Sequence, residues 1–481
     1  MKQPNILWIC TDQQRKDSLS CYGNPFTNTT HIDSLAQSGV LFENCTCQAP
    51  VCTPSRASYL TGRYPHTTTC RQNGQKIPGR ETLITKLFHD AGYVCGLAGK
   101  FHLAPGHPTH TYRTEERIDD GFDVFDWCHE PCYKWATSSY HRWLHEKGVE
   151  YKVTPSSLCS YVDEGMPAQY HYTTWCVEKA ISFIDTCEDL HRPWHFTINT
   201  FDPHAPFDPP KDYWDHFISM MDQFDLPDYV EGELDNKPVF QLEEHNFTTN
   251  SSKSNRGYNV HDMTQQDHRY IKAAYYAMVK LIDDQIGRLL DHLKKRNLLD
   301  NTLILFMSDH GEMLGDHGIY LKGPFFYECL SSVPLILSWP GHIAQNVRRS
   351  ALIELTDLAP TLLDLLGLDY PQGLQGTSFT KLLQKDAEDF HRENVFCEFY
   401  NALAYNDPPA YLTMLKTKRY KLVVTHGFEV GELYDLKEDP GEHYNLWDDP
   451  AHQPLKMQLM KQLMDRMAFT MDPLPARQCP Y

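Results

Sequence analysis

The stretch NILWICTDQQR, residues 5–15, begins as a short apolar run and ends in a row of polar residues. A run of this length bounded by polar residues is typical of a buried strand. Downstream, residues 31–40 and 81–93 have helix-like patterns with a glycine near the end, and residues 41–45 and 94–104 have strand-like patterns. This alternation predicts a mostly parallel sheet that is covered by helices.

The middle of the chain is less regular. Residues 104–165 and 208–262 are rich in aromatic, proline, acidic and polar residues, and we predict that both are surface insertions. Residues 267–297 have the pattern of one long amphipathic helix. Residues 302–312, TLILFMSDHGE, have the pattern of a buried strand that runs into a turn.

A domain boundary is expected near residues 370–390. Beyond it, short strand patterns suited to an antiparallel sheet precede a helical pattern at 456–469. We therefore predict an α/β fold with a large mixed, mostly parallel sheet sandwiched by helices in residues 1–375. Residues 376–481 are predicted to form a smaller C-terminal α+β domain with a short antiparallel sheet.

Composition narrows the classes of partner. The 481-residue chain has a formal net charge of −19 and no basic run, which argues against nucleic acid. No apolar run approaches the roughly 20 residues of a membrane span, and the N-terminus lacks the pattern of a secretion signal. We expect a cytoplasmic protein without a membrane partner, or a periplasmic one if a leader was removed. The fifteen scattered cysteines are then expected to be free thiols.

Three strand-like runs end in side chains that bind hard cations. One ends in Asp12-Gln13, another in Asp309-His310 and a third in Asp202-Pro203-His204. In open α/β sheets, ligands bind at the carboxyl ends of the strands. One divalent ion is therefore expected among Asp12, Gln13, Asp309 and His310. Oxygen donors with one imidazole favour Ca²⁺ or Mg²⁺, with Mn²⁺ or Zn²⁺ as alternatives. For either aspartate alone, the alternative is a turn cap.

Cys52 is a candidate nucleophile in the stretch QAPVCTPSRASYLTGRYP, residues 48–65. If Pro54 opens a helix, Cys52 lies just before the first turn, at the positive end of the helix dipole. Arg56, four residues on, is expected to point along the same side and to contact the Cys52 group. The alternative is a disulfide with a nearby cysteine, which a cytosolic setting disfavours. The nearby cysteines are Cys45, Cys47 and Cys70.

Cationic and neutral-base groups occur in several loops. Lys100 and His102 lie in AGKFHLA, His204 lies in DPHAPF, and His317 and Lys322 lie in GDHGIYLKGP. Any single histidine among the 25 in the chain is more simply explained as structural. Together, however, these groups fit an anion-binding site.

These stretches resemble, in order along the chain, the motifs of the type I, formylglycine-dependent sulfatases of the alkaline phosphatase superfamily. CTPSRASYLTGRYP (52–65) resembles the family signature, and NILWICTDQQRKD (5–17) resembles the first metal-binding strand. GYVCGLAGKFHL (92–103) resembles a lysine- and histidine-bearing block, and the segment from residue 308 to residue 328 resembles the second metal-binding block. ELYDLKEDPGEHYNL (432–446) resembles a motif of the C-terminal domain.

The resemblance implies a role for each candidate residue. A maturating enzyme would convert Cys52 to Cα-formylglycine, whose hydrate is the nucleophile. One divalent cation, Ca²⁺ first, would be held by the ligands Asp12, Gln13, Cys52, Asp309 and His310. Arg56 and Lys100 would steady the formylglycine, with His102 near its second hydroxyl. His204 and Lys322 would face the sulfate and the leaving group, and Asn73 would place a polar group on the sulfate.

Two positions depart from the best-known sulfatase pattern, in which an Asp stands at position 13 and an Asn at position 310. The pairing of Gln13 with His310 also resembles the phosphonate monoester hydrolase branch and some carbohydrate sulfatases. The implied activity is sulfuric ester hydrolysis, on a sulfated carbohydrate of glycosaminoglycan type or on an aryl sulfate. A phosphonate monoester or phosphodiester hydrolase is the first alternative. A non-catalytic sulfatase-like binding protein, in which Cys52 stays a thiol, is the second.

Overall fold

A large mixed sheet forms the centre of the computed structural model, which describes residues 3–246, 257–403, 406–477 and 479. Its eight strands follow the order β10-β2-β9-β8-β1-β7-β3-β4. The strands are β1 (Asn5–Thr11), β2 (Gly39–Thr46), β3 (Val94–Gly99), β4 (Val124–Trp127), β7 (Trp194–Asn199), β8 (Thr302–Ser308), β9 (Ser332–Ser338) and β10 (Val347–Glu354). Only β9 runs antiparallel to its neighbours, which confirms the predicted mixed, mostly parallel sheet.

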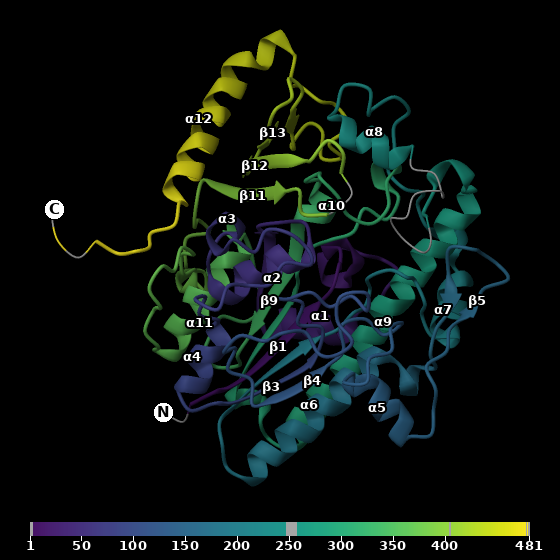
Figure 1. The fold of residues 1–481 in the computed structure, drawn as a ribbon, viewed down its shortest axis with the longest axis vertical. Coiled ribbons are helices and arrows are strands. Elements are labelled where there is room, and N and C mark those ends of the chain that lie inside the picture. Colours follow the sequence, from purple (N-terminus) through teal and green to yellow (C-terminus); the bar gives the residue numbers. More distant parts are fainter. Residues whose placement is uncertain (1–2, 247–256, 404–405, 478, 480–481) are drawn as a thin grey trace.

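Helices cover both faces of this sheet because its central strands are apolar on both sides. In β1, Ile6 and Trp8 point into one core, and Leu7 and Ile9 point into the other. The first core is shared with α2 (Cys52–Thr61), α4 (Ile84–Asp90) and α11 (Leu358–Leu366), and the second with α1 (Thr30–Gln37), α6 (Tyr172–Asp189) and α9 (Gln265–Lys295). Figure 1 shows the sheet between these two groups of helices.

The C-terminal part forms a separate antiparallel sheet in the order β11-β12-β13-β14. Its strands are β11 (Asn394–Tyr400), β12 (Tyr411–Thr417), β13 (Tyr420–Thr425) and β14 (Glu432–Asp435), and α12 (Gln453–Phe469) packs on one face. Figure 1 shows α12 lying along this sheet at one end of the molecule. The predicted boundary at 375–376 falls between α11 and β11 and stays a prediction, since Phe379 and Leu382 beyond it still pack into the first core of the large sheet.

The predicted insertions contain regular structure. Residues 104–165 supply β4, which pairs with β3 at the edge of the large sheet, and also α5 (Ser139–Glu146). The prediction of a mere surface insertion is wrong there, because β4 is too short for its pattern to stand out in the sequence. Residues 208–262 supply α7 (Lys211–Ile218) and α8 (Val239–His245). None of the helices in the described part of the chain combines the length and apolarity needed to cross a bilayer.

Candidate active site

Three neighbouring strands end at the same place, and their loops bring the acidic residues together. Thr11 at the end of β1 pairs with Ser308 at the end of β8, so Asp12 and Asp309 follow side by side. The Asp309 amide donates to the Thr11 carbonyl at 3.2 Å, and the Asp12 amide donates to the carbonyl of Asp202 after β7 at 3.3 Å. The adjacency of parallel strands thus produces the cluster that the sequence could only suggest.

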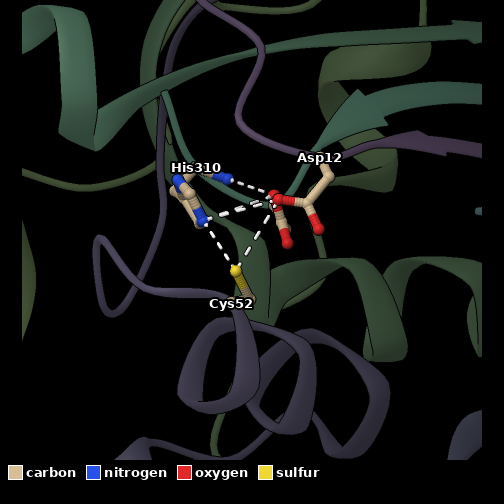
Figure 2. Close-up of side chains that lie close together, drawn as sticks. Asp12, Cys52 and His310 are labelled. Carbon is tan, nitrogen blue, oxygen red and sulfur yellow. Dashed lines mark hydrogen bonds and ion pairs between the residues drawn. The ribbon is translucent and has the colours of Figure 1, made fainter. Parts of the chain in front are cut away.

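Helix α2 brings Cys52 to this cluster. The helix begins at Cys52 itself, after an extended Val51, and not at Pro54 as predicted. Pro54 fits inside the first turn, where its missing N–H leaves no helical hydrogen bond unmade. Cys52 Sγ lies 3.2 Å from His310 Nε2 and 3.6 Å from Asp12 Oδ1. Figure 2 shows Cys52 at the head of its helix, pointing toward Asp12 and His310.

Cys52 is a free thiol, and so are its nearby cysteines Cys45, Cys47 and Cys70, so the disulfide alternative for Cys52 is not realised. The neighbouring Thr53 amide donates to Asn73 Oδ1 at 3.0 Å. Asn73 therefore caps α2 from a distant loop, and its proposed contact with a sulfate stays a prediction.

Arg56 binds the two carboxylates, whereas the sequence predicted a contact with the Cys52 group. Its Nε donates to Asp309 Oδ2 at 2.9 Å and its Nη2 to Asp12 Oδ2 at 3.0 Å, and all three side chains are fully buried. The guanidinium thus occupies one oxygen of each carboxylate. The two Oδ1 atoms are left to face His310 Nε2, at 3.9 Å from Asp12 and 3.8 Å from Asp309.

The arrangement of His310 fits a metal ligand. Its Nδ1 lies 2.9 Å from the Gly311 carbonyl, which can only accept, so Nδ1 carries a proton and Nε2 is the nitrogen that faces the cluster. Ligand atoms of Asp12, Cys52, Asp309 and His310 all lie within 4.8 Å of one another. Two carboxylate oxygens and a correctly oriented imidazole therefore fit a divalent cation.

Two lysines flank Cys52. Lys100 Nζ lies 2.7 Å from Asp12 Oδ2 and 3.7 Å from Cys52 Sγ, and Lys322 Nζ lies 3.0 Å from Cys52 Sγ. Burial raises the pKa of the Cys52 thiol, but Lys100, Lys322 and His310 outweigh burial and hold this pKa well below its ordinary value. The position occupied by Cys52 therefore stabilises a negative charge.

His204 joins Lys322 at this position. Lys322 Nζ donates to His204 Nε2 at 2.9 Å, while His204 Nδ1 bonds the Ala205 carbonyl. Gln13 also meets Lys322, since its Oε1 accepts from Nζ at 2.6 Å. The structure thus brings these three predicted residues together on one side of Cys52.

His102 approaches Cys52 from another side. It lies close enough to Cys52 to interact with it electrostatically, and its backbone adopts a left-handed φ of 60°. Burial, with help from the neighbouring His129 and Lys100, lowers the pKa of His102 to about 3, so the imidazole is neutral. The buried Glu115 holds this loop, since its carboxylate accepts from the His102 amide at 2.9 Å and from the Leu103 amide at 2.8 Å.

One candidate residue, His317, lies away from Cys52. Three residues next to the site were not predicted from the sequence. His317 bonds Glu233 instead of joining the group around Cys52. The residues that the sequence analysis did not identify are Glu115, His129 and Glu312. Glu312 lies in the same SDHGE stretch as two predicted ligands, and that proximity was the one available signal. Glu115 and His129 lie in an irregular segment without a pattern.

The fold and the site define a hydrolytic enzyme that receives an anionic ester beside a cation-binding cluster. The chain belongs to the sulfatase family, because the Sulfatase family profile matches residues 4–368. A second profile, N-sulphoglucosamine sulphohydrolase, C-terminal, matches residues 315–468. The protein is therefore a sulfuric ester hydrolase, and its predicted family and fold class are confirmed.

Relatives and solved structures extend over nearly the whole chain. An arylsulfatase of Clostridium perfringens is 30% identical, over 96% of this chain and 95% of the relative. An N-acetylglucosamine-6-O-sulfatase of Bacteroides thetaiotaomicron is 27% identical, over 96% of this chain and 86% of the relative. The crystal structure of a phosphonate monoester hydrolase of Agrobacterium radiobacter superimposes with a TM-score of 0.84 at 25% identity, covering 98% of this chain and 97% of that one.

Proposed function

We propose that the chain hydrolyses a sulfate ester on a saccharide, with Cys52 converted to Cα-formylglycine and one divalent cation, Ca²⁺ first, beside it. One observation supports this most directly. The Cys52 sulfur lies within 4 Å of a carboxylate, two lysines and an imidazole at the head of a buried helix. Such a setting favours an anionic nucleophile and an anionic ester in the same place.

The residues around Cys52 are proposed to have separate roles in charge neutralisation and in proton transfer. Formylglycine hydrate supplies two hydroxyls on one carbon, which serine or cysteine cannot. Lys100 and Lys322 would neutralise sulfate oxygens. The proton shared by Lys322 Nζ and His204 Nε2 would pass to the departing alcohol, and His102 would accept a proton from the second hydroxyl. Help of this kind is typically worth about 10²–10⁴-fold in rate.

The cation is proposed to be held by Asp12, Gln13, Asp309 and His310. When bound, it supplies positive charge to a sulfate oxygen and to the nucleophile. The oxygen-rich donor set supports Ca²⁺ over a softer metal, with Mg²⁺, Mn²⁺ and Zn²⁺ as alternatives. A chelator should abolish activity, and adding back each metal separately should identify the native ion by the largest recovery of kcat/KM.

The names of a relative and of a matching family profile support a saccharide as the substrate. The N-acetylglucosamine-6-O-sulfatase and the N-sulphoglucosamine sulphohydrolase profile both point to sulfated amino sugars. We therefore expect turnover of sulfated mono- or disaccharides of glycosaminoglycan type. A panel of defined sulfated saccharides, compared with an aryl sulfate, tests this. Turnover of the aryl sulfate alone would contradict the saccharide assignment and leave the sulfatase class intact.

The phosphonate and phosphodiester alternative is favoured by one specific observation. Gln13 and His310 replace an Asp and an Asn of the best-known sulfatases, and a phosphonate monoester hydrolase shares the whole fold. The two candidate activities are separated by measuring the rates of one enzyme preparation on an aryl sulfate, a phosphonate monoester and a phosphodiester with the same leaving group. A much faster phosphorus ester would replace the proposed substrate.

Conversion of Cys52 is tested by mass spectrometry of the peptide that contains it. We propose that a formylglycine-generating enzyme acts on this chain, as the CTPSR motif supports. In a host with that enzyme, the peptide should be lighter than the thiol form by about 18 Da. An unmodified thiol with no hydrolysis of any sulfate ester would favour the non-catalytic alternative. Cys52→Ala serves as the inactive control.

We further propose a reducing, cytoplasmic location, which the free thiols of the buried cysteines support. Titration of the unfolded protein with a thiol reagent, after purification from its own cell without reductant, should count fourteen thiols once Cys52 is converted. Cell fractionation provides the independent check, and recovery in the periplasmic fraction would contradict the location.

A further inference from the structure

Gln13 lies between two groups of opposite hydrogen-bonding character. On one side its Nε2 donates to the Glu312 carboxylate. On the other side its Oε1 accepts from Lys322 Nζ at 2.6 Å. A carboxylate can only accept and an ammonium can only donate, so these partners allow one orientation of the amide. The orientation directs the oxygen of Gln13 toward Lys322 Nζ, which itself lies 3.0 Å from Cys52 Sγ and 3.4 Å from His310 Nε2, and it directs the NH₂ toward Glu312.

The backbone of Gln13 is also fixed, at a left-handed φ of 64°. Its amide donates to Asp309 Oδ1 at 3.1 Å, and its carbonyl accepts from the Tyr275 hydroxyl at 2.8 Å. With the main chain held on both sides, only the amide rotation of the side chain remains to be decided. Glu312 decides it from the NH₂ side, and Lys322 from the oxygen side.

Glu312 also holds the loop that carries Lys322. Its side chain is fully buried, and its Oε1 accepts from the Leu314 amide at 2.9 Å and from the Leu321 amide at 2.5 Å. One carboxylate therefore sets both the Gln13 amide and the position of residue 321, next to Lys322. Glu312 therefore acts through Gln13 and through the loop of Lys322. Neither contact gives Glu312 a direct part in the reaction.

We propose that Glu312 is a positioning residue that makes Gln13 an oxygen ligand for the cation. This inference rests on the proposed function, since it concerns the same cation site. It explains how a glutamine serves where other sulfatases have an aspartate. An aspartate offers an oxygen in either orientation, whereas a glutamine needs a partner that holds its NH₂ away from the metal.

The substitution Glu312→Gln isolates this role. The new amide oxygen can still accept from the Leu314 and Leu321 amides, so the loop is retained. Its NH₂ would then face the NH₂ of Gln13, two donors in contact, and only Lys322 would still hold the Gln13 amide in its orientation. Loss of such an outer partner typically weakens metal affinity by about 10–100-fold. We expect the Ca²⁺ Kd of the full-length protein to rise within that range.

Two further variants show whether the effect passes through Gln13. In Gln13→Glu/Glu312→Gln the carboxylate and amide exchange places, which restores the hydrogen bond and an oxygen toward the site, so the Ca²⁺ Kd should return to the wild-type value or below. In a Gln13→Ala background, Glu312→Gln should have no further effect on Kd, since there is no amide left to orient. If Glu312 only stabilised the fold, the exchanged pair would not restore the Ca²⁺ affinity. Glu312→Gln would then also weaken Ca²⁺ binding in the Gln13→Ala background.

The matched control is Asp283→Asn in α9. Asp283 is also a buried carboxylate that accepts from two backbone amides, those of His31 and Ile32, at 2.9 and 2.8 Å. The same chemical change there should leave the Ca²⁺ Kd unchanged.

The measurement is Ca²⁺ binding by calorimetry or by chelator competition, with chelator-stripped protein and circular dichroism to verify the fold. If wild type binds Ca²⁺ and Glu312→Gln binds equally well, the inference is overturned and the proposed function stands. A failure of the exchanged pair to recover affinity also overturns the inference. If wild type binds no divalent cation, both the proposed cation site and this inference fall.

Discussion

Arg56 balances the charge of the site at the level of a single residue. It is fully buried and bonds one oxygen of Asp12 and one of Asp309, and it also donates to the Lys100 carbonyl at 3.0 Å. Two carboxylates this close repel each other in a medium of low dielectric unless a cation lies between them. Arg56 supplies that cation from the protein, on the side opposite the proposed metal.

The substitution Arg56→Gln should therefore destabilise the metal-free protein. Removing one partner of a buried ion pair typically costs about 3–5 kcal/mol of unfolding free energy. Urea denaturation in the presence of a chelator measures the loss, and saturating Ca²⁺ should recover part of it.

The matched control is Arg348→Gln. Arg348 pairs with Glu43 at 3.0 Å on the surface, where both side chains are more than a third exposed, so its loss should cost less than about 1 kcal/mol. Equal urea midpoints for the two variants would contradict the proposed role of Arg56.

At the level of elements, α2 depends on a cap from outside the helix. Val51 precedes the helix and offers no side-chain cap, and the Thr53 amide is bonded by Asn73 from the loop after α3 (Pro65–Thr68). The Asn73 amide in turn donates to the Ala402 carbonyl at 3.0 Å, in the segment after β11. The start of the helix that carries Cys52 is thus fixed by a residue that also contacts the C-terminal part.

Two substitutions of Asn73 separate its structural role from its predicted role on the sulfate. Asn73→Ala removes the acceptor and should lower the unfolding free energy by about 1 kcal/mol. Asn73→Asp keeps an acceptor for Thr53 and should preserve stability, while its charge beside the sulfate should raise KM. Thermal unfolding and steady-state kinetics test the two effects. An unchanged KM in Asn73→Asp would remove Asn73 from the substrate-binding set.

At the level of the whole molecule, Glu233 joins three distant segments. Its Oε2 accepts from His317 Nδ1 at 2.7 Å, from Lys237 Nζ at 2.8 Å and from His443 Nδ1 at 3.2 Å. His317 lies in the loop between β8 and Lys322, and His443 lies in the C-terminal part. One buried carboxylate therefore holds together the insertion between β7 and α9, the loop between β8 and Lys322, and the C-terminal part.

This junction predicts a pH dependence of stability. Burial alone would raise the pKa of Glu233, but His317 and Lys237 outweigh it and lower the pKa from 4.5 to about 2. A carboxyl whose pKa is lower in the folded state stabilises the fold above pH 4.5, and this stability is lost as the pH falls toward 2. The full contribution is on the order of 3 kcal/mol.

The comparison of wild type with Glu233→Gln measures this contribution. The difference between their urea midpoints should be largest near pH 6 and should narrow by pH 3, because only wild type has the carboxyl to protonate. A difference that stays constant over this range would show that the pKa of Glu233 is not lowered by folding.

Part of the site was predictable because it lies in local patterns. Asp12, Asp309 and His310 each follow an apolar strand, and Cys52 lies in a motif that can be read without the structure. The fold class followed from the alternation of strands and helices. The helix start at Cys52 and the short strand β4 were not predicted, since each depends on contacts that local sequence does not contain.

The order of the strands and helices, the apolar faces that pack them and the chemical types at the strand ends are all properties of local stretches of sequence. Which side chains meet is defined by the three-dimensional packing of these elements. Gln13 and Glu312 lie 299 positions apart, and Arg56 lies 253 positions from Asp309. Hydrogen bonds act over about 3 Å, so the orientation of an amide or the partner of a guanidinium is defined only after the strands have assembled.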